Sequence, residues 1–579
     1  ISSHFFPIML KIHYYSSLAV LVAVASATQS NSAAIFSTAA FVQSPKPHAY
    51  TSKLKRNPLS PPLNPTLLLS AALPDDCDDD LDDREECQPF YEPHELWNVE
   101  VVDRISDWTG NKEMFPNPLT LKENIPNSWF VDEDAAVAAK VQVDAHETDE
   151  DHEKGLRSEA FFLAGPRLEI AHDVTKSKAA IVTCGGLCPG LNTVVREVVM
   201  CLKRQYGISD VYGVPAGYRG FKEPEKWRLL DEVIVSNLHN IGGSILGSSR
   251  GGHDTGAIVD TLVEENINLL FVVGGDGTVR GAGKIAEEVK RRGLSISVAV
   301  VPKTIDNDVP LLDRTFGFET AVDAARDAIN VANVEAEGFP FGLGVVKVMG
   351  RNSGFIAMHS TLGARVVDLC LVPEVKFYFD GPGGIVDHIY ERLLSHGKAV
   401  VVVAEGAGQD LIVASADTKK EPKRDASGNV LLEDVGPWLC RKLKKRLDTK
   451  LESISGTSLN IHGDKLTLKY VDPSYMVRGV PPNTADNVYC TQLAHNAVHG
   501  ALAGMTSFLV GSINGRECYV PIKLVANKRN VIDTAHQSLW EYVVFDTAQP
   551  SFIIDSDDRD EADVLISASG GVILATDDS

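Results

Sequence analysis

The chain has 579 residues, which is too long for one ordinary core and long enough for two or three compact units. Its hydrophobic fraction of 44% is typical of a globular protein, and its one long apolar stretch, residues 18–27, is far shorter than the roughly 20 residues that span a bilayer. A net charge of -23 argues against a nucleic-acid partner, and nine scattered cysteines without a CxxC pair indicate neither a disulfide framework nor a zinc site.

Residues 1–74 contain no Asp or Glu, carry four Lys and one Arg and are rich in Ser. This composition is typical of an organelle transit peptide. The apolar residues 17–27, which end in Ala-Ser-Ala, leave a secretory signal as the alternative. The acid-free stretch continues far beyond that run and no disulfide pattern follows, so the transit peptide is the favoured interpretation.

Residues 75–174 are first acidic and then rich in Pro, Asn and Trp. Pro116, Pro118 and Pro126 break any long element there. We predict an arm or linker without chemistry for this stretch.

From residue 175 onward, short β-rich apolar runs end in glycine-rich turns and alternate with helical periods. Val194, Val198 and Leu202 share a helix face after Asn192, and a second helix is expected after Thr278. This alternation predicts a doubly wound α/β fold, with ligands at the carboxyl ends of the strands. The expected strands are residues 179–183, 269–273, 296–301, 344–348 and 399–404.

Two glycine-rich turns follow expected strands. The first, CGGLCPGLN at 184–192, opens a helix whose amino end favours phosphate, although glycine at such a turn often serves only tight packing. The second, GGDGT at 274–278, presents Asp276 among free backbone donors, where a carboxylate could hold Mg²⁺ beside nucleotide phosphates or simply cap the helix. Gly277 leaves room for an extended triphosphate to pass.

A third turn, PKTIDND at 302–308, carries closely spaced acids. Thr304, Asp306 and Asp308 alternate, so in an extended segment they project together. Two neighbouring carboxylates are unfavourable unless a metal, a cation or a shared proton compensates them, which indicates a site. One of them can act as a general base toward a substrate hydroxyl.

Two further turns each supply an arginine. Arg250 ends the glycine-serine loop at 242–251, and Arg351 lies in MGRNSG at 349–354. A planar guanidinium can hold phosphate or the charge that develops in a transition state.

In this order, the motifs GGLCPGLN, GGSILGSSRGG, GGDGT, PKTIDND, MGRNSG, AEGAGQ at 404–409 and PSYMVRG at 473–479 resemble the 6-phosphofructokinase family, and its plant ATP-dependent branch most closely. The resemblance covers residues 178–500. It implies an ATP-dependent kinase that uses Mg²⁺ to phosphorylate the C1 hydroxyl of fructose 6-phosphate, with Asp306 as proton acceptor.

The resemblance also assigns site residues. The catalytic set would be Asp306, Thr304, Arg351 and Arg250. The nucleotide would be bound by Gly186, Arg250, Gly251, Gly274, Gly275, Asp276, Gly277 and Thr278, with Asp276 as the magnesium ligand. The sugar phosphate would be bound by Thr304, Ile305, Asp306, Met349, Gly350, Arg351, Glu405, Tyr475, Met476, Val477 and Arg478.

At the level of the whole chain, the resemblance implies two doubly wound Rossmann-like α/β domains with the active site in the cleft between them. We expect a nucleotide-binding domain at 175–345 and a sugar-phosphate-binding domain at 346–480. Residues 481–579 are expected to form C-terminal helices that return to the first domain, plus an acidic tail. A homo-oligomer, either a dimer or a tetramer, and a location in the chloroplast stroma are implied, with the cytoplasm as the alternative location.

Three points stay open at this level. Lys303 is typical of pyrophosphate-dependent relatives, whereas Gly277 favours ATP, so a pyrophosphate-dependent enzyme remains an alternative, as does a catalytically silent regulatory subunit. Redox control through Cys184 and Cys188 is a further possibility, set against a simple packing role. Residues 409–465 and the tail beyond 525 carry no assignable motif.

Overall fold

The computed structural model describes residues 97–139, 158–415, 424, 430–526, 528–534 and 538–552. The predicted transit peptide, residues 1–74, and the acidic tail from residue 553 lie outside these ranges. Within them, no helix combines the length and the apolar character needed to cross a membrane.

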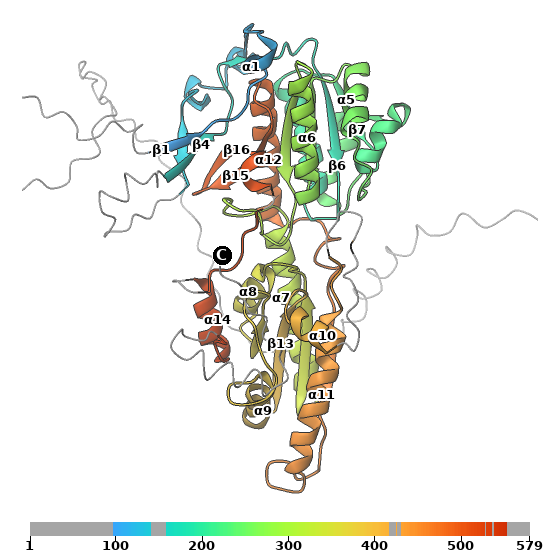
Figure 1. Ribbon diagram of the computed structural model, residues 1–579, viewed down its shortest axis with the longest axis vertical. Helices are drawn as coiled ribbons and strands as arrows, with labels where there is room; N and C mark the ends of the chain where they lie inside the picture. The colour runs from blue at the N-terminus through green and yellow to red at the C-terminus, as the bar shows by residue number, and fades with distance from the viewer. Residues whose placement is uncertain are drawn as a thin grey trace, which may run out of the picture. The chain divides into compact units, whose positions relative to one another are not determined.

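The larger of two principal sheets has ten strands in the order β1-β4-β16-β15-β10-β9-β6-β7-β8, with β3 paired to β4 (Figure 1). Strands β15, β10, β9, β6 and β7 run parallel, and β16 is antiparallel to both of its neighbours. The bounds are β1 Trp97–Glu100, β3 Ala136–Ala138, β4 Ser158–Leu163, β6 Lys178–Thr183, β7 Asp210–Val214, β8 Arg228–Leu229, β9 Leu269–Gly274, β10 Ser297–Pro302, β15 Phe508–Ile513 and β16 Arg516–Pro521.

Both faces of this sheet are buried. Along β9, Phe271 and Val273 pack into one hydrophobic cluster and Leu270 and Val272 into another, so successive side chains serve opposite faces. Helices α3 and α12 cover the first face, and α5 and α6 cover the second. Their bounds are α3 Leu191–Met200, α5 Thr255–Glu264, α6 Asp276–Arg291 and α12 Thr484–Leu502.

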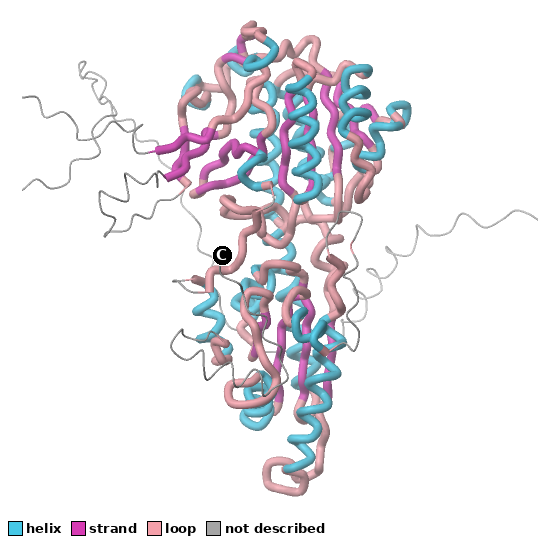
Figure 2. The backbone as a smooth tube through the Cα atoms, in the orientation of Figure 1, coloured by secondary structure: helices cyan, strands magenta, loops and turns pink. Residues whose placement is uncertain are grey.

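The smaller sheet has four parallel strands in the order β12-β13-β11-β14. Helices α7 and α8 cover one face and α9 and α11 the other, and Figure 2 shows this layered arrangement. The bounds are α7 Phe318–Glu337, β11 Gly342–Val348, α8 Phe355–Ala364, β12 Leu369–Leu371, α9 Ile385–His396, β13 Lys398–Ala404, α10 Gln409–Ala414, α11 Val435–Ser453 and β14 Thr467–Val471.

The remaining elements are short or peripheral. Strands β2 and β5 form a small antiparallel pair, and α14 packs against α8 and β12 of the smaller-sheet domain. Their bounds are α1 Ser106–Thr109, β2 Phe115–Pro116, β5 Glu169–Ile170, α4 Glu232–Val235, α13 Ile522–Val525 and α14 Leu539–Thr547.

The fold class is therefore as predicted, with two α/β units each covered by helices on both faces, but the expected subdivisions need correction. The boundary at 345 cuts strand β11, which belongs wholly to the smaller sheet. Residues 75–174 are more than an arm, because β1, β3 and β4 extend the larger sheet. Likewise, residues 481–579 supply the strands β15 and β16 of the larger sheet as well as helices. Helix α14 packs on the smaller-sheet domain, not on the larger-sheet domain to which it was expected to return.

A buried carboxylate holds α12 to the beginning of α7. Asp486 accepts hydrogen bonds from the backbone N–H of Gly317 and of Thr320, both at 2.8 Å, and from the Thr320 hydroxyl at 2.5 Å. It thereby satisfies donors of the first helical turn that have no partner within the helix. Because α12 lies on the larger sheet and α7 on the smaller, this contact ties the two units together.

We expect Asp486→Ala to destabilise the fold by about 2 kcal/mol, because it leaves these buried donors without an acceptor. Calorimetry should show a lower thermal midpoint. Asp327→Ala is the matched control, since that side chain is 67% exposed on the same α7 helix. Equal midpoints for the two variants would contradict the role given to Asp486.

Candidate active site

The turns that follow β6, β9 and β10 form one wall of a cleft. Backbone bonds hold them together, with the Cys184 N–H donating to the Val273 carbonyl and the Lys303 N–H donating to the Gly274 carbonyl, both at 2.9 Å. The carboxyl ends of adjacent parallel strands are where α/β proteins bind ligands. The three motifs predicted to act together therefore meet at one edge of the sheet.

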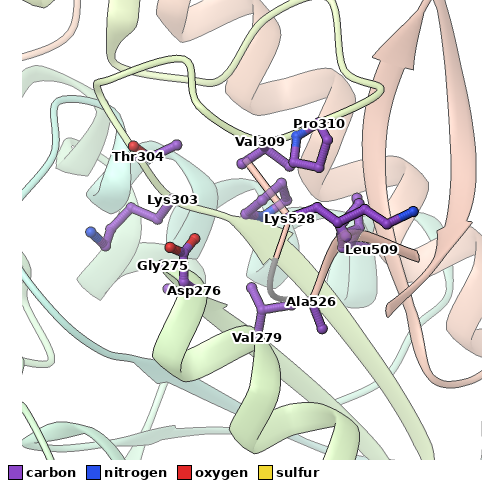
Figure 3. Close-up of a pocket in the computed structure, with 13 residues that line it drawn as sticks. Gly275, Asp276, Val279, Lys303, Thr304, Val309, Pro310, Leu509, Ala526 and Lys528 are labelled. Atoms are coloured by element: carbon purple, nitrogen blue, oxygen red, sulfur yellow. The ribbon is translucent and has the colours of Figure 1, made fainter. Parts of the chain in front are cut away.

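Asp276 is the first residue of α6 and directly follows Gly275 (Figure 3). A carboxylate in the first turn interacts favourably with the positive end of the helix dipole. It also faces a cation that sequence analysis missed, because Nη2 of Arg529 lies 3.3 Å from Oδ2 of Asp276. The carboxylate is 41% exposed, so it is accessible from the cleft.

The loop after β10 is organised by Thr304. Its hydroxyl donates to Oδ1 of Asp308 at 2.9 Å and accepts from the Asp306 N–H at 3.1 Å. These bonds fix the backbone on both sides of Asp306. Oδ1 of Asp306 is buried, and it has no hydrogen-bond partner among the described residues. A buried, unpartnered oxygen in a cleft is suited to accept a proton from a ligand.

The electrostatics of this loop are dominated by acids. Burial and the neighbouring carboxylates of Asp308 and Glu405 raise the pKa of Asp306 well above its ordinary value, while Lys303 and Arg351 oppose the rise. Burial and the neighbouring Asp276 likewise raise the pKa of Asp308. Burial and mutual repulsion thus favour a proton on these two neighbouring carboxyl groups over two full negative charges.

Turns after β11 and β13 of the smaller sheet form the opposite wall. The Glu405 N–H donates to the Val348 carbonyl, and the Gly406 N–H donates to the Gly350 carbonyl, both at 3.0 Å. Gly350 has φ +130°, and a Cβ there would collide with the Ser353 carbonyl, so glycine is required for this turn. Met349, Arg351 and Asn352 are thereby directed into the cleft.

The two walls enclose one continuous cleft with a volume of about 490 Å³, within the roughly 300–1,000 Å³ of a small-molecule site. A direct hydrogen bond links the two walls, because the Ser353 hydroxyl donates to the Asp306 carbonyl at 3.2 Å. Most of the residues predicted from the sequence line this cleft: Gly186, Arg250, Gly251, Gly275, Asp276, Gly277, Thr278, Thr304, Ile305, Asp306, Met349, Arg351, Glu405 and Arg478.

A family model for phosphofructokinase matches residues 178–501, which include every strand and helix that forms this cleft. The chain belongs to the phosphofructokinase family. The membership predicted from the motifs is therefore confirmed.

Curated relatives within the family are similar over most of their length. The protein named ATP-dependent 6-phosphofructokinase 1 of Arabidopsis thaliana is 45% identical over 461 residues, covering 79% of this chain and 92% of the relative. ATP-dependent 6-phosphofructokinase 4, chloroplastic, of the same plant is 42% identical and covers 81% of this chain and 85% of the relative. A bacterial ATP-dependent 6-phosphofructokinase from Borreliella burgdorferi is also 42% identical, with 69% of this chain covered.

Solved structures support the fold. The pyrophosphate-dependent phosphofructokinase of Marinobacter aquaeolei matches with a TM-score of 0.51 at 21% identity, covering 69% of this chain and 94% of that chain. At this identity the likeness concerns the phosphofructokinase fold alone.

Five predicted residues of the phosphofructokinase site do not line the cleft. Gly274 lines a smaller adjoining pocket, and a Cβ at this position would collide with the Thr278 side chain. Gly350 shapes its turn without contacting the cleft. The Val477 side chain is fully buried in the hydrophobic core, and the predicted contact of this residue with the sugar phosphate stays a prediction. Tyr475 and Met476 are 79% and 57% exposed, outside the cleft lining, and their substrate contacts stay predictions.

Several cleft residues were missed from the sequence. They are mostly cationic or aromatic, and all but Asn352, which belongs to MGRNSG, lie outside the quoted motifs: Tyr218, His253, Arg280, Lys284, Asn352 and Arg529. Arg280 and Lys284 follow Asp276 on α6 at helical spacing, so the period of that helix could have placed them. Arg529 lies far away in the chain, and no local signal could have placed it.

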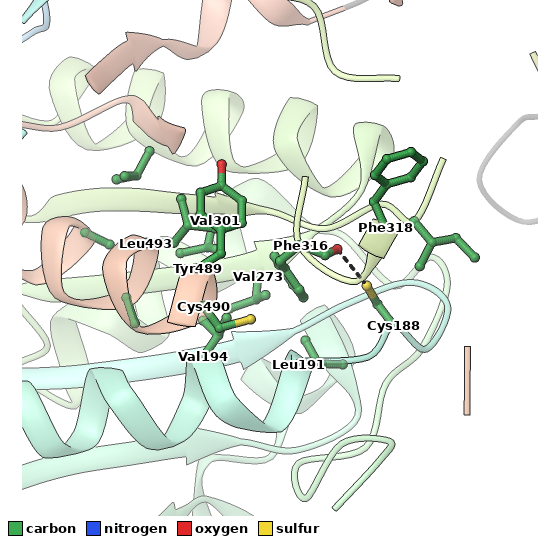
Figure 4. Close-up of a cluster of buried hydrophobic side chains, with 14 of the residues drawn as sticks. Cys188, Leu191, Val194, Val273, Val301, Phe316, Phe318, Tyr489, Cys490 and Leu493 are labelled. Atoms are coloured by element: carbon green, nitrogen blue, oxygen red, sulfur yellow. Dashed lines mark hydrogen bonds between the residues drawn. The ribbon is translucent and has the colours of Figure 1, made fainter. Parts of the chain in front are cut away.

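The two cysteines of the first turn are packed as small apolar groups. Burial raises the pKa of the Cys184 thiol to about 12 and that of Cys188 further. Cys188 packs among hydrophobic side chains, and its Sγ donates to the Phe316 carbonyl at 3.2 Å (Figure 4). Thiols react through the thiolate, so this environment favours the packing role over redox control.

Proposed function

We propose that this chain is an ATP-dependent 6-phosphofructokinase that transfers the γ-phosphoryl group of ATP to the C1 hydroxyl of fructose 6-phosphate. The observation that carries the proposal is the 45% identity to a relative of that name over 92% of the relative's length. The cleft supports it, because Asp276 lies on one wall, Arg351 on the other, and Asp306 beside them in one continuous space.

In this mechanism, catalysis comes mainly from positioning the two substrates and from neutralising the charge of the transferring phosphoryl group. Asp306 accepts the proton of the sugar hydroxyl through its unpartnered Oδ1 as the hydroxyl attacks the γ-phosphorus. The Thr304 hydroxyl holds the loop in place through its bonds to Asp308 and to the backbone of Asp306. Arg250 and Arg351 meet the charge that develops on the transferring group.

We further propose Mg²⁺ as the metal and Asp276 as its protein ligand. Mg²⁺ in nucleotide enzymes keeps several waters and takes only one or two carboxylates besides phosphate oxygens, so a single accessible carboxylate fits it. Mg²⁺ would neutralise phosphate charge, while the chain's own residues orient the donor.

The donor is proposed to be ATP rather than pyrophosphate. Gly277 lies in the cleft lining on the first turn of α6 and adds no side chain beside Asp276. Lys303 also lines the cleft and keeps the pyrophosphate-dependent enzyme as the second candidate. Steady-state assays of fructose 6-phosphate phosphorylation with each donor, side by side, decide between them. Activity with pyrophosphate alone would overturn the proposal, and inactivity with both would support a silent subunit.

We expect kcat/KM for fructose 6-phosphate to rise with pH. Burial raises the pKa of Asp306, so in the free enzyme the carboxyl is protonated on the acid side and can accept a proton only after it ionises. The midpoint of the acid limb should therefore lie well above the ordinary carboxyl value of about 4. A pH–rate profile checks this, and an acid limb centred near pH 4 would speak against Asp306 as the base.

The plastid location is also a proposal. Chloroplastic isoforms occur among the relatives of similar identity, and the acid-free composition of residues 1–74 supports a transit peptide. Removing residues 1–74 should leave the thermal midpoint and kcat unchanged, because that segment lacks the periodicity of a domain. An insoluble or inactive truncated protein would show that the segment belongs to the fold.

We propose that the protein assembles as a homo-oligomer, either a dimer or a tetramer. Val331 and Val334 on α7 are 58% and 67% exposed, and Tyr475 is 79% exposed, so large apolar side chains are available for an interface. Light scattering on the purified protein measures the state directly.

A further inference from the structure

A C-terminal segment, residues 528–534, runs from the larger-sheet domain toward α14 on the smaller-sheet domain and passes over the catalytic loop. Two backbone bonds hold it there. The Asn530 N–H donates to the Asp308 carbonyl at 2.9 Å, and the Ile532 N–H donates to Oε1 of Glu374 at 3.0 Å. The Ile532 side chain is buried, so the segment is anchored on both sides.

Glu374 makes the second anchor part of the cleft wall. The same oxygen, Oε1, also accepts from the Gly354 N–H at 3.0 Å, at the end of the MGRNSG turn. One carboxylate therefore joins the C-terminal segment to the turn that carries Arg351, while Asn530 joins it to the loop of Asp306. Arg529 directly precedes the first anchored residue, Asn530, so its backbone is held beside the loop of Asp306.

Arg529 reaches from this segment into the nucleotide side of the cleft. Its Nη2 lies 3.3 Å from Oδ2 of Asp276, and the two side chains are 33% and 41% exposed. A partly exposed ion pair contributes little to stability, so it can exchange partners at small cost. The contact nevertheless occupies the carboxylate that is proposed to face the metal and the nucleotide.

The charges of an arriving nucleotide suit both partners of this pair. A guanidinium donates to phosphate oxygens in a planar, bidentate manner, which is stronger than one contact at 3.3 Å to an exposed carboxylate. Asp276 in turn becomes free to serve a divalent cation. A nucleotide that enters with its metal can therefore replace the Arg529–Asp276 pair with two more favourable contacts.

We propose that Arg529 is a phosphate-binding residue of the nucleotide site, held on Asp276 while the site is empty and transferred to the phosphate chain when Mg-ATP binds. This inference rests on the proposed function. It assigns a role in the reaction to the C-terminal segment, in which no motif is found.

The test measures binding rather than turnover. Arg529→Gln should weaken Mg-ATP binding, measured by calorimetry without fructose 6-phosphate, on the order of ten- to a hundredfold, because a charged hydrogen-bond donor is lost. Binding of Mn²⁺ alone, measured by electron paramagnetic resonance, should stay equal or become tighter, because Asp276 loses its competing cation. Arg529→Lys keeps the charge and should show a smaller loss of Mg-ATP affinity.

The control is Lys523→Gln, which removes a 70% exposed cation from α13 and should match the parent in both measurements. Weaker Mg-ATP binding with unchanged or tighter Mn²⁺ binding supports the proposal. Unchanged Mg-ATP affinity overturns it, and so does a joint loss of both affinities with a lower thermal midpoint, which indicates a purely structural role. If the parent itself fails to bind Mg-ATP, the proposed function fails instead.

Should Arg529→Gln fail to fold, Arg529→Lys decides alone. A Mg-ATP affinity for Arg529→Lys that equals that of the parent within twofold then overturns the proposal, because a bidentate guanidinium contact is not reproduced by an ammonium group.

Discussion

Asp306→Ser is expected to lower kcat by at least 10²-fold and to leave the affinity for Mg-ATP nearly unchanged. The substitution removes the buried Oδ1 that has no partner among the described residues and that is placed to accept the hydroxyl proton. General-base catalysis typically contributes 10²- to 10⁴-fold, or about 3 to 5 kcal/mol of barrier. The nucleotide contacts lie on other turns, so calorimetric binding of Mg-ATP should change little.

Two comparisons make the result of Asp306→Ser specific. The acid limb of the pH–rate profile should disappear in the variant, because the group that titrates is gone. Asp327→Ser, at an exposed position on α7, should leave kcat at the parent value. A kcat for Asp306→Ser within threefold of the parent would remove Asp306 from the base role.

Five of the parallel strands were predicted, because burial on both faces leaves a continuous apolar run in the sequence, whereas the parallel strands β7, β12, β14 and β15 were not. The expected strand at 269–273 differs by one residue from the observed Leu269–Gly274, and that at 399–404 by one residue from Lys398–Ala404. The turns after these strands were predictable from their residue types. Glycine at a strand end allows a tight turn, and the threonine and aspartate beside it supply the hydroxyl and carboxylate groups of a site.

One helix start was misplaced for a physical reason. The first helix was expected after Asn192, but α3 begins at Leu191 and includes Asn192, directly after Gly190, which has a left-handed backbone. The Asn192 side chain instead donates to the Ile241 carbonyl at 2.9 Å and accepts from the Ile245 N–H at 2.8 Å. It therefore holds the glycine-serine loop that carries Arg250, a tertiary role that the local sequence does not reveal.

The elements outside the apolar runs were missed because their order depends on distant partners. Strand β4 is no shorter than the predicted strands, but it takes its place by pairing with β1, β3 and β16 rather than by its own sequence pattern. Arg529 was missed within the site for the same reason. Its contact with Asp276 joins residues far apart in the sequence, and only the folded path of the C-terminal segment brings them together.

Gly277→Asp is expected to weaken Mg-ATP binding about ten- to several-hundredfold, and it tests the choice of donor. The new carboxylate would lie next to Asp276 on the first turn of α6, in the cleft lining. Two like charges about 4 Å apart are unfavourable by roughly 1 to 4 kcal/mol, depending on how well water screens them, and the nucleotide's phosphates add further repulsion. The fold should tolerate the change, because acidic residues are favourable in the first turn of a helix.

The loss in Gly277→Asp has two possible causes, the charge of the new side chain and its bulk. Gly277→Ala separates them, since it adds a Cβ without a charge. If charge dominates, Gly277→Ala should retain most of the Mg-ATP affinity that Gly277→Asp loses, as measured by calorimetric titration. Pyrophosphate has no α-phosphate or nucleoside to accommodate, and Lys303 already lines the cleft to meet its charge. Gly277→Asp should therefore lose ATP-dependent activity far more than any pyrophosphate-dependent activity the protein shows. Equal Mg-ATP affinity in Gly277→Asp and the parent would place Gly277 outside the donor site and favour pyrophosphate as the donor.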